Sequence, residues 1–284
     1  MRTIKQQHRA VSAPIADLTT YRALPTQNVE HIDPFLFLNH HGPQVYRPHN
    51  RGLPFGPHPH RGFETVTFIV AGDIMHQDSG GHQSVIEAGG IQWMTAGSGL
   101  IHSEISSDKF KEQGGPLEIL QLWVNLPARH KMVAPKYIGL QKADIPEVSA
   151  DHGRVTIHAV AGTWEGTPGA VQPLTDMQLA TIDLRAGGQL NLSIPAARSI
   201  FFYTIRGRLR VNGQETQAHY LTEFNHDGDD LHIEALDDAL LLLGHAEPFN
   251  EPIVAYGPFV MNSEDEIRQA YQDYQAGKFG TWQE

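Results

Sequence analysis

The sequence predicts an all-β protein that consists of two similar β-rich units, with one short helix near the end of the chain. Many short segments rich in β-branched and aromatic residues are separated by turn residues, among them 27 glycines and 18 prolines in 284 residues. Such spacing is typical of a sandwich or barrel. In addition, the strand–glycine–strand pattern of 65–74 recurs at 200–209, so that Gly72 corresponds to Gly207. Two copies of a unit of about 100–120 residues would account for the length.

Strands are expected in the first half at 64–70, 74–78, 84–86 and 117–124. The segment 64–70 is rich in valine, threonine and isoleucine and ends at the turn residues Ala71-Gly72-Asp73. Ser79-Gly-Gly-His82 is a plausible hairpin loop before 84–86. Because side chains alternate along a strand, 117–124 places Gln121 and Trp123 on one face.

Three prolines, Pro127, Pro135 and Pro146, indicate a connection between the two halves. We therefore expect an N-terminal domain over 1–125, a linker over 126–148 and a C-terminal domain over 149–284. Strands of the second half are expected at 154–160, 179–184, 190–194, 200–205 and 208–211.

One segment near the end of the chain, 263–277, has a convincing helical pattern. Ser263 and Glu266 form a capping box at its start, and Gly277 stands where a helix would end. Apolar residues then follow at helical spacing: Ile267, Ala270, Tyr271 and Tyr274. We expect this apolar stripe to pack across a β-domain.

Composition excludes several classes of protein. The net charge of −11 opposes binding to phosphate backbones and anionic lipids, so we expect no direct nucleic-acid or membrane partner. The absence of cysteine excludes disulfides, thiolate metal sites and a cysteine nucleophile, whereas 17 histidines leave imidazole and carboxylate as metal ligands. Neither a signal-like start nor a run of 18 apolar residues is present. A cytoplasmic monomer is expected.

Two short segments carry the chemistry. Pro57-His58-Pro59-His60 and Ile101-His102-Ser103-Glu104 each place two ligating residues two positions apart, and residues i and i+2 of a strand point to the same face. If the two strands face one another inside a barrel, three imidazoles and one carboxylate surround one point. That set suits a first-row divalent metal and resembles an open ferrous oxygenase centre.

Each segment taken alone also has an interpretation without metal chemistry. A single His-x-His is often incidental in a chain with 17 histidines, and Pro57 and Pro59 could mark a surface loop. His102 alone could be a core histidine, and a bound metal could stabilise the two strands without taking part in a reaction. The joint pattern of His58-x-His60, a hairpin and His102-x-Glu104 favours a metal centre.

The amino-acid sequence of these segments resembles that of the pirin family, which belongs to the cupin superfamily. The similarity lies in Pro57-His-Pro-His-Arg-Gly-Phe-Glu64, in Gly90-Ile-Gln-Trp-Met-Thr-Ala-Gly97 and in Asn250 to Asn262 with the following helix. The resemblance implies a bicupin, that is, two cupin barrels packed face to face, with an iron or similar metal in the N-terminal barrel only. It implies His58, His60, His102 and Glu104 as ligands, in agreement with the spacing, and leaves Glu64 outside the ligand set.

The second half lacks the same ligands. At the offset of 135, His58 and His60 correspond to Ser193 and Pro195. His232-Ile-Glu234 superficially repeats His102-Ser-Glu104, but it has no opposing histidine pair. A metal-free C-terminal barrel is therefore expected.

Two functions follow from the resemblance: quercetin 2,3-dioxygenase-like cleavage of a flavonol, or metal-dependent regulation through a protein partner such as a transcription factor or metabolic enzyme. We favour the dioxygenase, with one divalent metal per chain, Fe(II) first and Mn, Ni, Co, Cu or Zn as alternatives. Glu104 is the candidate base for the substrate hydroxyl. Phe68 and Trp93 are candidates for lining the barrel, against the commoner role of ordinary core residues.

Overall fold

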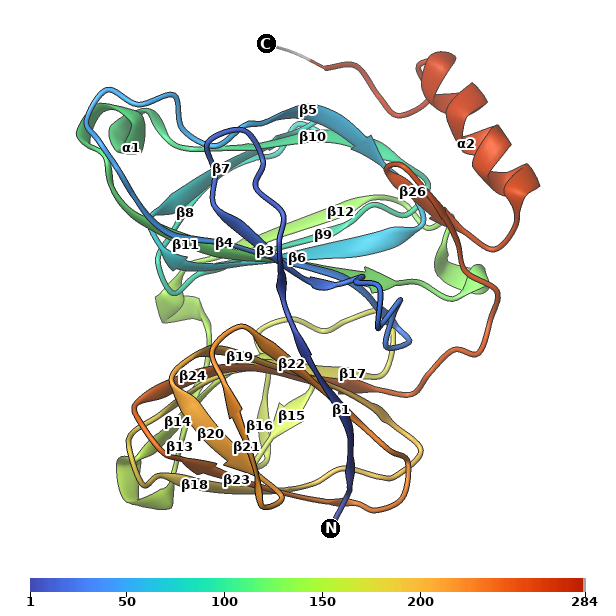
Figure 1. Cartoon of the computed structure of the whole chain (residues 1–284). Helices are drawn as coiled ribbons and strands as arrows, with labels where there is room; N and C mark the ends of the chain where they lie inside the picture. The colour runs from blue at the N-terminus through green and yellow to red at the C-terminus, as the bar shows by residue number, and fades with distance from the viewer. Residues whose placement is uncertain (283–284) are drawn as a thin grey trace. The chain divides into compact units, whose positions relative to one another are not determined.

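The computed structural model describes residues 1–282 and confirms an all-β protein with a short C-terminal helix (Figure 1). The chain folds into two compact units. The unit that contains His58 to Glu104, here called the motif unit, comprises residues 12–21, 36–143 and 249–284. The other, the companion unit, comprises residues 1–11, 22–35 and 144–248.

The motif unit is built from a four-stranded and a seven-stranded sheet, which lie one above the other in Figure 1. The four-stranded sheet has the order β5 (Phe55–His60), β10 (Leu100–Ile105), β7 (Asp73–Asp78), β8 (Gln83–Glu87). The seven-stranded sheet has the order β12 (Lys136–Leu140), β9 (Ile91–Thr95), β6 (Phe63–Ala71), β11 (Gly115–Asn125), β4 (Phe35–Tyr46), β3 (Thr20–Leu24), β2 (Val11–Ser12).

The companion unit repeats this plan. Its smaller sheet has the order β18 (Gln189–Ser193), β23 (Asp230–Ala235), β20 (Arg208–Val211), β21 (Gln214–Gln217). Its larger sheet has the order β1 (Ile4–Arg9), β22 (Tyr220–Phe224), β19 (Ser199–Arg206), β24 (Ala239–Ala246), β17 (Met177–Leu184), β14 (Val155–Ala161), β13 (Glu147–Ala150). A small hairpin completes it, β15 (Thr163–Trp164) with β16 (Thr167–Pro168).

The repeated sheet order explains why the strand–glycine–strand pattern occurs twice in the sequence. Strands β6 and β7 hold the same places in the motif unit as β19 and β20 hold in the companion unit. The turns that join them contain Gly72, with φ +83°, and Gly207, with φ +75°. A left-handed turn of this kind favours glycine, which is why the two glycines coincide at the offset of 135.

The compact units differ from the predicted domain ranges in four places. Residues 22–35 of the predicted N-terminal domain belong to the companion unit. Strand β1 pairs with β22 and therefore belongs to the companion unit. Residues 249–282 belong to the motif unit, because the buried cluster of Phe259, Met261 and Ile267 with Phe279 packs against Ile101 of β10. The predicted linker contains β12, which pairs with β9. Long-range strand pairing and packing decide these placements.

The remaining short elements belong mainly to the motif unit. They are the helix α1 (Asp108–Gln113), which the sequence pattern did not predict, the 3-10 turns at Ala128–His130, Lys142–Asp144 and Asp151–Gly153, the hairpin of β25 (Val254–Tyr256) with β26 (Phe259–Met261), and the helix α2 (Glu264–Gln275).

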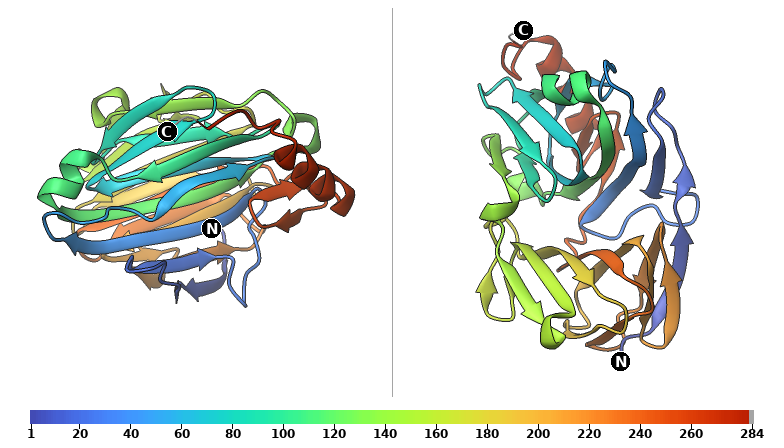
Figure 2. Two further views of the ribbon diagram at one scale, coloured as in Figure 1. Left: turned by 90° about the horizontal axis from the view of Figure 1, so that it is seen from above. Right: turned by 90° about the vertical axis from the view of Figure 1, so that its left-hand side faces the viewer.

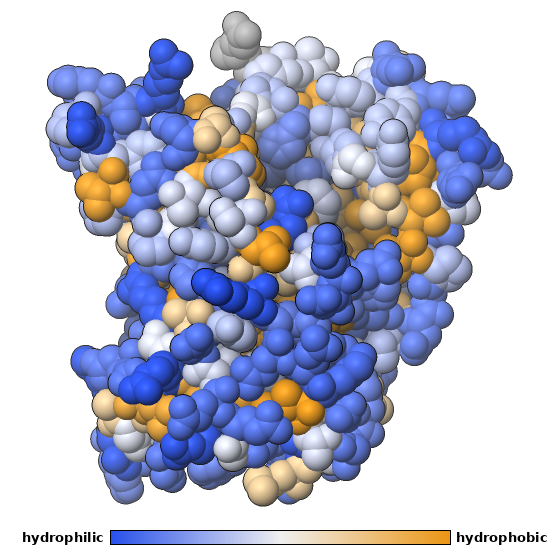
Figure 3. Space-filling view, in the orientation of Figure 1, coloured by the Kyte–Doolittle hydropathy of each residue, from blue (hydrophilic) through white to orange (hydrophobic). Residues whose placement is uncertain are grey.

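Helix α2 begins and ends as predicted. The Ser263 hydroxyl accepts a hydrogen bond from the Glu266 amide, and Gly277 adopts φ +74°. Lys278 N donates to Asp273 O, and Gly277 N donates to Tyr274 O, as in a Schellman motif. Figure 2 shows the helix, coloured red, beside the ends of the strands, and its outer face is hydrophilic in Figure 3.

The buried face of α2 differs from the predicted stripe at Tyr274 and at Asp273. Ile267 and Ala270 are buried as expected, whereas Tyr274 is exposed and the carboxylate residue Asp273 is buried. Among residues 1–282, no helix is long and apolar enough to cross a membrane.

Candidate metal centre

The two motif segments lie side by side in one sheet. Strands β5 and β10 pair in antiparallel register, with His58 opposite His102 and His60 opposite Leu100. The sequence pattern led us to expect two strands that face one another across a barrel, but they are hydrogen-bonded neighbours. Adjacent strands still bring the same face of each strand together, so the histidines converge.

The three histidines form one compact group. Nitrogen atoms of His58, His60 and His102 all lie within 4.8 Å of one another. Their ring centroids are 4.8 Å apart for His58 and His60, 4.4 Å for His58 and His102, and 5.0 Å for His60 and His102. Such spacing allows three imidazoles to bind one ion.

Hydrogen bonds show which ring nitrogen of His58 and of His60 carries the proton and which keeps its lone pair. The Nδ1 atom of His58 lies 2.7 Å from the carbonyl oxygen of Gly56, and Nδ1 of His60 lies 3.2 Å from that of Pro258. Because a carbonyl only accepts, each Nδ1 carries the proton and each Nε2 is left with its lone pair. Metal-ligating histidines are usually held in this way by a second hydrogen bond.

His102 is the unusual member of the group. Its side chain is buried, and neither ring nitrogen has a hydrogen-bond partner in the described part of the chain. Leaving a buried polar group unpaired costs about 1–3 kcal/mol. A metal ion would satisfy one of these nitrogens, so the residues present fit a bound metal.

The protonation states suit metal binding as well. Burial, with a smaller contribution from His58, lowers the pKa of His60 to about 3. Burial and then the neighbouring histidines also lower the pKa of His102 well below its ordinary value. Both rings are therefore neutral at pH 7, which is the form that binds a metal.

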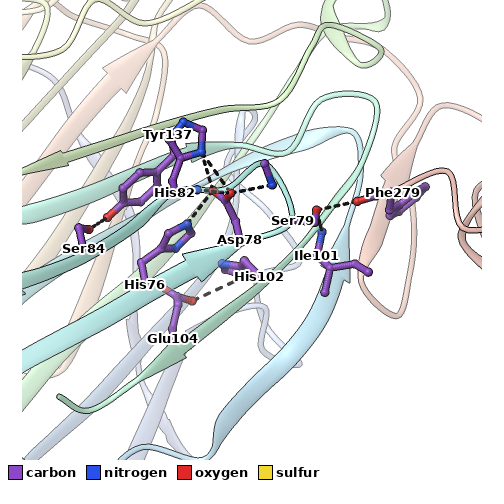
Figure 4. A network of polar contacts seen from close by, with 11 residues as sticks. His76, Asp78, Ser79, His82, Ser84, Ile101, His102, Glu104, Tyr137 and Phe279 are labelled. Carbon is purple, nitrogen blue, oxygen red and sulfur yellow. Dashed lines mark hydrogen bonds and ion pairs between the residues drawn. The ribbon is translucent and has the colours of Figure 1, made fainter. Parts of the chain in front are cut away.

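Glu104 lies beside this group but is not one of its three members. Its Oε2 atom is 3.9 Å from Nε2 of His102, as the close view in Figure 4 illustrates. Its Oε1 atom accepts a hydrogen bond of 2.8 Å from the Thr67 hydroxyl, and the side-chain amide of Gln121 lies 2.9 Å from that hydroxyl. The carboxylate is thus oriented from strands β6 and β11.

Glu64, Phe68 and Trp93 lie on the other face of the seven-stranded sheet. Glu64 and Phe68 alternate with Thr67 along β6, and Trp93 Nε1 donates to Glu64 Oε1 over 3.1 Å. Phe68 and Trp93 therefore do not line the site, because the face that reaches Glu104 is the one with Thr67, and the commoner role of ordinary core residues applies to them. Alternation defines two faces but does not say which one is interior.

Aromatic residues next to the group come from elsewhere. The ring of Trp123 lies 5.3 Å from that of His60, stacks on Phe37 at 4.6 Å and lies 4.4 Å from Phe63. The alternation of 117–124 places Trp123 on one face with Gln121, but the sequence alone does not show that this face is the one toward the histidines.

A second polar network adjoins His102 (Figure 4). The His76 ring lies 5.5 Å from the His102 ring and stacks almost parallel on Tyr137 at 3.8 Å. His76 Nε2 lies 2.9 Å from Asp78 Oδ2, and Asp78 Oδ1 lies 3.1 Å from His82 Nδ1. The pattern His76-x-Asp78 in a predicted strand was visible in the sequence, whereas Tyr137 lay in the predicted linker.

The companion unit carries different residues at the corresponding strands. Strand β23 places His232 opposite Asn191 of β18, as β10 places His102 opposite His58. Nδ1 of His232 is hydrogen-bonded to the Asn191 side chain. Within residues 1–282, a group of three metal-ligating side chains is found in the motif unit alone.

Both halves of the chain match models of one protein family. A model described as Pirin matches residues 17–124, and a model described as the Pirin C-terminal cupin domain matches residues 179–280. A Pseudomonas aeruginosa protein named "Putative quercetin 2,3-dioxygenase PA2418" is 38% identical over 266 residues, which cover 94% of this chain and 92% of that protein.

Solved structures agree with these matches. The crystal structure of quercetin 2,3-dioxygenase from Acinetobacter baumannii is 32% identical, with a TM-score of 0.91 over 99% of each chain. The bacterial pirin YhhW from Escherichia coli, solved in complex with nickel(II), is 22% identical, with a TM-score of 0.68 over 86% of this chain and 99% of that chain. The second comparison shows a shared fold.

Proposed function

The chain belongs to the pirin family, whose members have two cupin domains, and from this premise we propose that it is a metal-dependent dioxygenase that cleaves flavonols. The names of the Pseudomonas and Acinetobacter relatives support a substrate of the quercetin type. The observation that carries the proposal is the buried, unsatisfied His102 beside the imidazoles of His58 and His60.

The proposed ligands are His58, His60, His102 and Glu104. Three imidazole nitrogens and one carboxylate suit a first-row divalent metal and leave room for further ligands at a six-coordinate ion. We propose Fe(II), one ion per chain; the nickel complex of YhhW supports metal binding by this fold without fixing the metal here. Bound Fe(II) would supply Lewis acidity toward the 3-hydroxyl group of a flavonol and the redox capacity that a reaction with O2 requires.

Glu104 is the residue proposed to take the proton from that hydroxyl. A carboxylate within reach of the hydroxyl can act as a general base, which contributes about 10²–10⁴-fold to a rate. Thr67 donates to Oε1 of Glu104 over 2.8 Å, whereas Oε2 is the oxygen nearer to His102. The same carboxylate would serve as ligand and base, so the metal and the proton would compete for its oxygens.

The aromatic residues beside His60 suit a flat substrate. Trp123 and Phe37 stack on each other, and both are half-buried rather than fully enclosed. Aromatic rings offer apolar surface and favourable stacking to another aromatic ring. These two side chains are therefore the proposed contact for the rings of a flavonol.

The proposal is tested by loading the protein anaerobically with Fe(II), adding quercetin and O2, and measuring carbon monoxide. We expect carbon monoxide from the wild type and from His232→Ala, because His232 lies in the companion unit and bonds Asn191. His58→Ala should produce almost none. An iron-loaded wild type that binds quercetin without releasing carbon monoxide would contradict the dioxygenase. Pull-downs with ferrous, ferric and metal-free protein would then examine the regulatory alternative.

A further inference from the structure

Residues 258–279, here called the closing segment, contact both strands that carry the three histidines. The segment contains β26 and helix α2 and lies in the same compact unit as β5 and β10. Its contacts with β5 and with β10 are made by different residues. The first set includes a hydrogen bond to His60 itself, and the second reaches the residue before His102 through Ser79.

The first set of contacts holds the end of β5. The Pro258 carbonyl lies 3.2 Å from Nδ1 of His60, and the Val260 amide donates to the Arg61 carbonyl over 3.1 Å. The Arg61 side chain is buried, its Nη1 donates to Oδ2 of Asp273 over 2.9 Å, and its guanidinium lies 4.6 Å from the centre of the Phe279 ring. His60 and the following residue are thus bound to the closing segment.

The buried Lys131 links the backbone that follows β5 to the backbone of β26. The Nζ atom of Lys131 donates to the carbonyl oxygens of Gly62 and Val260 over 2.8 Å and 3.0 Å, and to Oδ1 of Asn125 over 2.7 Å. A Cβ on Gly62 would lie 2.0 Å from the Val260 carbonyl oxygen. Glycine is therefore required for the backbone of the closing segment to approach so closely.

The second set of contacts holds β10. The Ser79 hydroxyl donates to the Phe279 carbonyl over 2.6 Å and accepts from the Ile101 amide over 3.0 Å (Figure 4). Ile101 directly precedes His102. In addition, a Cβ on Gly99 would lie 2.7 Å from the Phe279 ring, so the ring packs against the backbone at the start of β10.

Asp273 anchors these contacts from helix α2. It is 8% exposed, and its carboxylate accepts hydrogen bonds from Arg61, Gln269 and Lys278. Removing the charge would leave the Arg61 guanidinium buried without its anionic partner, which is costly. Asp265 offers a matched comparison, because it also pairs with an arginine, Arg268, but on the exposed side of the same helix.

We propose that the closing segment positions the metal centre and that Asp273, acting through Arg61, is its principal positioning residue. The proposal rests on the metal site proposed above. The ion pair keeps the Pro258 carbonyl on Nδ1 of His60, and this bond directs Nε2 toward the ion. Residues that hold metal ligands in this way typically contribute about 10–100-fold to metal affinity.

Co(II) alone is the probe for the test, with wild type, Asp273→Asn and Asp265→Asn compared in the full chain. Affinity is measured by competition with a chelator, and ligand geometry by the visible absorption of the Co(II)-saturated, folded protein. We expect Asp273→Asn to bind Co(II) about 10-fold more weakly, with an altered visible spectrum. Asp265→Asn should match the wild type, and a general loss of stability would not change the spectrum at saturation.

Each outcome decides a different point. Wild-type affinity together with a wild-type spectrum in Asp273→Asn would overturn the role of the closing segment and leave the metal site intact. A wild type that binds no Co(II) would overturn the metal site itself. If Asp273→Asn does not fold, Ser79→Ala takes its place, since it breaks the bond to Phe279 and spares the buried ion pair. Unchanged affinity and spectrum in Ser79→Ala would then count against the proposal.

Discussion

The Nδ1 atom of His60 lies 3.2 Å from the carbonyl oxygen of Pro258, although 198 positions separate the two residues in the sequence. This bond leaves Nε2 of His60 with its lone pair available to a metal. A ligand near the start of the motif thus depends on a segment near the end of the chain. The proposed chemistry therefore belongs to the whole motif unit rather than to the two short motifs.

We expect one metal ion per chain, because three converging histidines were found in the motif unit and His232 of the companion unit faces an asparagine. Elemental analysis of metal-saturated protein should give about one equivalent. The double change His58→Ala and His102→Ala should remove it, whereas His232→Ala should not. Two equivalents that persist in the double variant would rule out this assignment.

Glu104→Gln should lower turnover by roughly 10²–10⁴-fold, the usual contribution of a general base. Glutamine keeps the size and one oxygen of the side chain but removes its negative charge. Substrate affinity should change less than the rate. Metal content must be measured in the same samples, since the change also weakens a ligand. Full activity at normal metal content would exclude Glu104 as the base.

Gly62→Ala should destabilise the fold more than Gly213→Ala. Both glycines have positive φ, +88° and +86°, and an alanine in this conformation costs about 1–2 kcal/mol. A Cβ on Gly62 would also lie 2.0 Å from Val260 O, whereas one on Gly213 would meet no described atom within 4 Å other than its chain neighbours. Denaturant unfolding of both variants measures the difference. Equal losses of stability in the two variants would show that the closing segment can move at little cost to make room for a Cβ at Gly62.

Stability should fall as pH is lowered from about 6.5 to about 4, in part because of His245. Burial, and then Arg198, lowers the pKa of His245 from 6.5 to about 4. Between these values the unfolded chain binds more protons than the folded one, so acid favours unfolding, by an amount on the order of 2–3 kcal/mol.

His245→Gln is the matched variant for this effect. The Nδ1 atom of His245 accepts from Arg198 Nε over 2.8 Å, and a glutamine oxygen can accept the same bond at any pH. The free energy of unfolding of the variant should therefore depend less on pH between about 4 and 6.5. An identical pH dependence in both proteins would show that His245 does not contribute.

The sequence predicted the local features of the site well. His58, His60 and His102 were identified because the two-residue period of a strand places them on one face, and the structure brings these three together. Ser263 and Gly277 were identified as the ends of the helix because capping depends on residues a few positions apart.

Features that depend on distant parts of the chain could not be predicted in this way. Trp93 and Trp123 both lie in alternating strands, and only the stacking of the sheets decides that Trp123 faces the histidines. Asp273 looks like a solvent-exposed helix residue until Arg61, 212 positions earlier, is placed against it. The pairing of β1 with β22 likewise has no local signal.

The most direct test of the metal centre is an anomalous-difference map from crystals of the Co(II)-loaded protein. We predict one strong peak at bonding distance, about 2.0–2.2 Å, from Nε2 of His58 and His60, from a ring nitrogen of His102 and from a carboxylate oxygen of Glu104. A peak held by the three histidines without Glu104 would correct the ligand set. A map with no peak at these histidines, or with its strongest peak in the companion unit, would contradict the account.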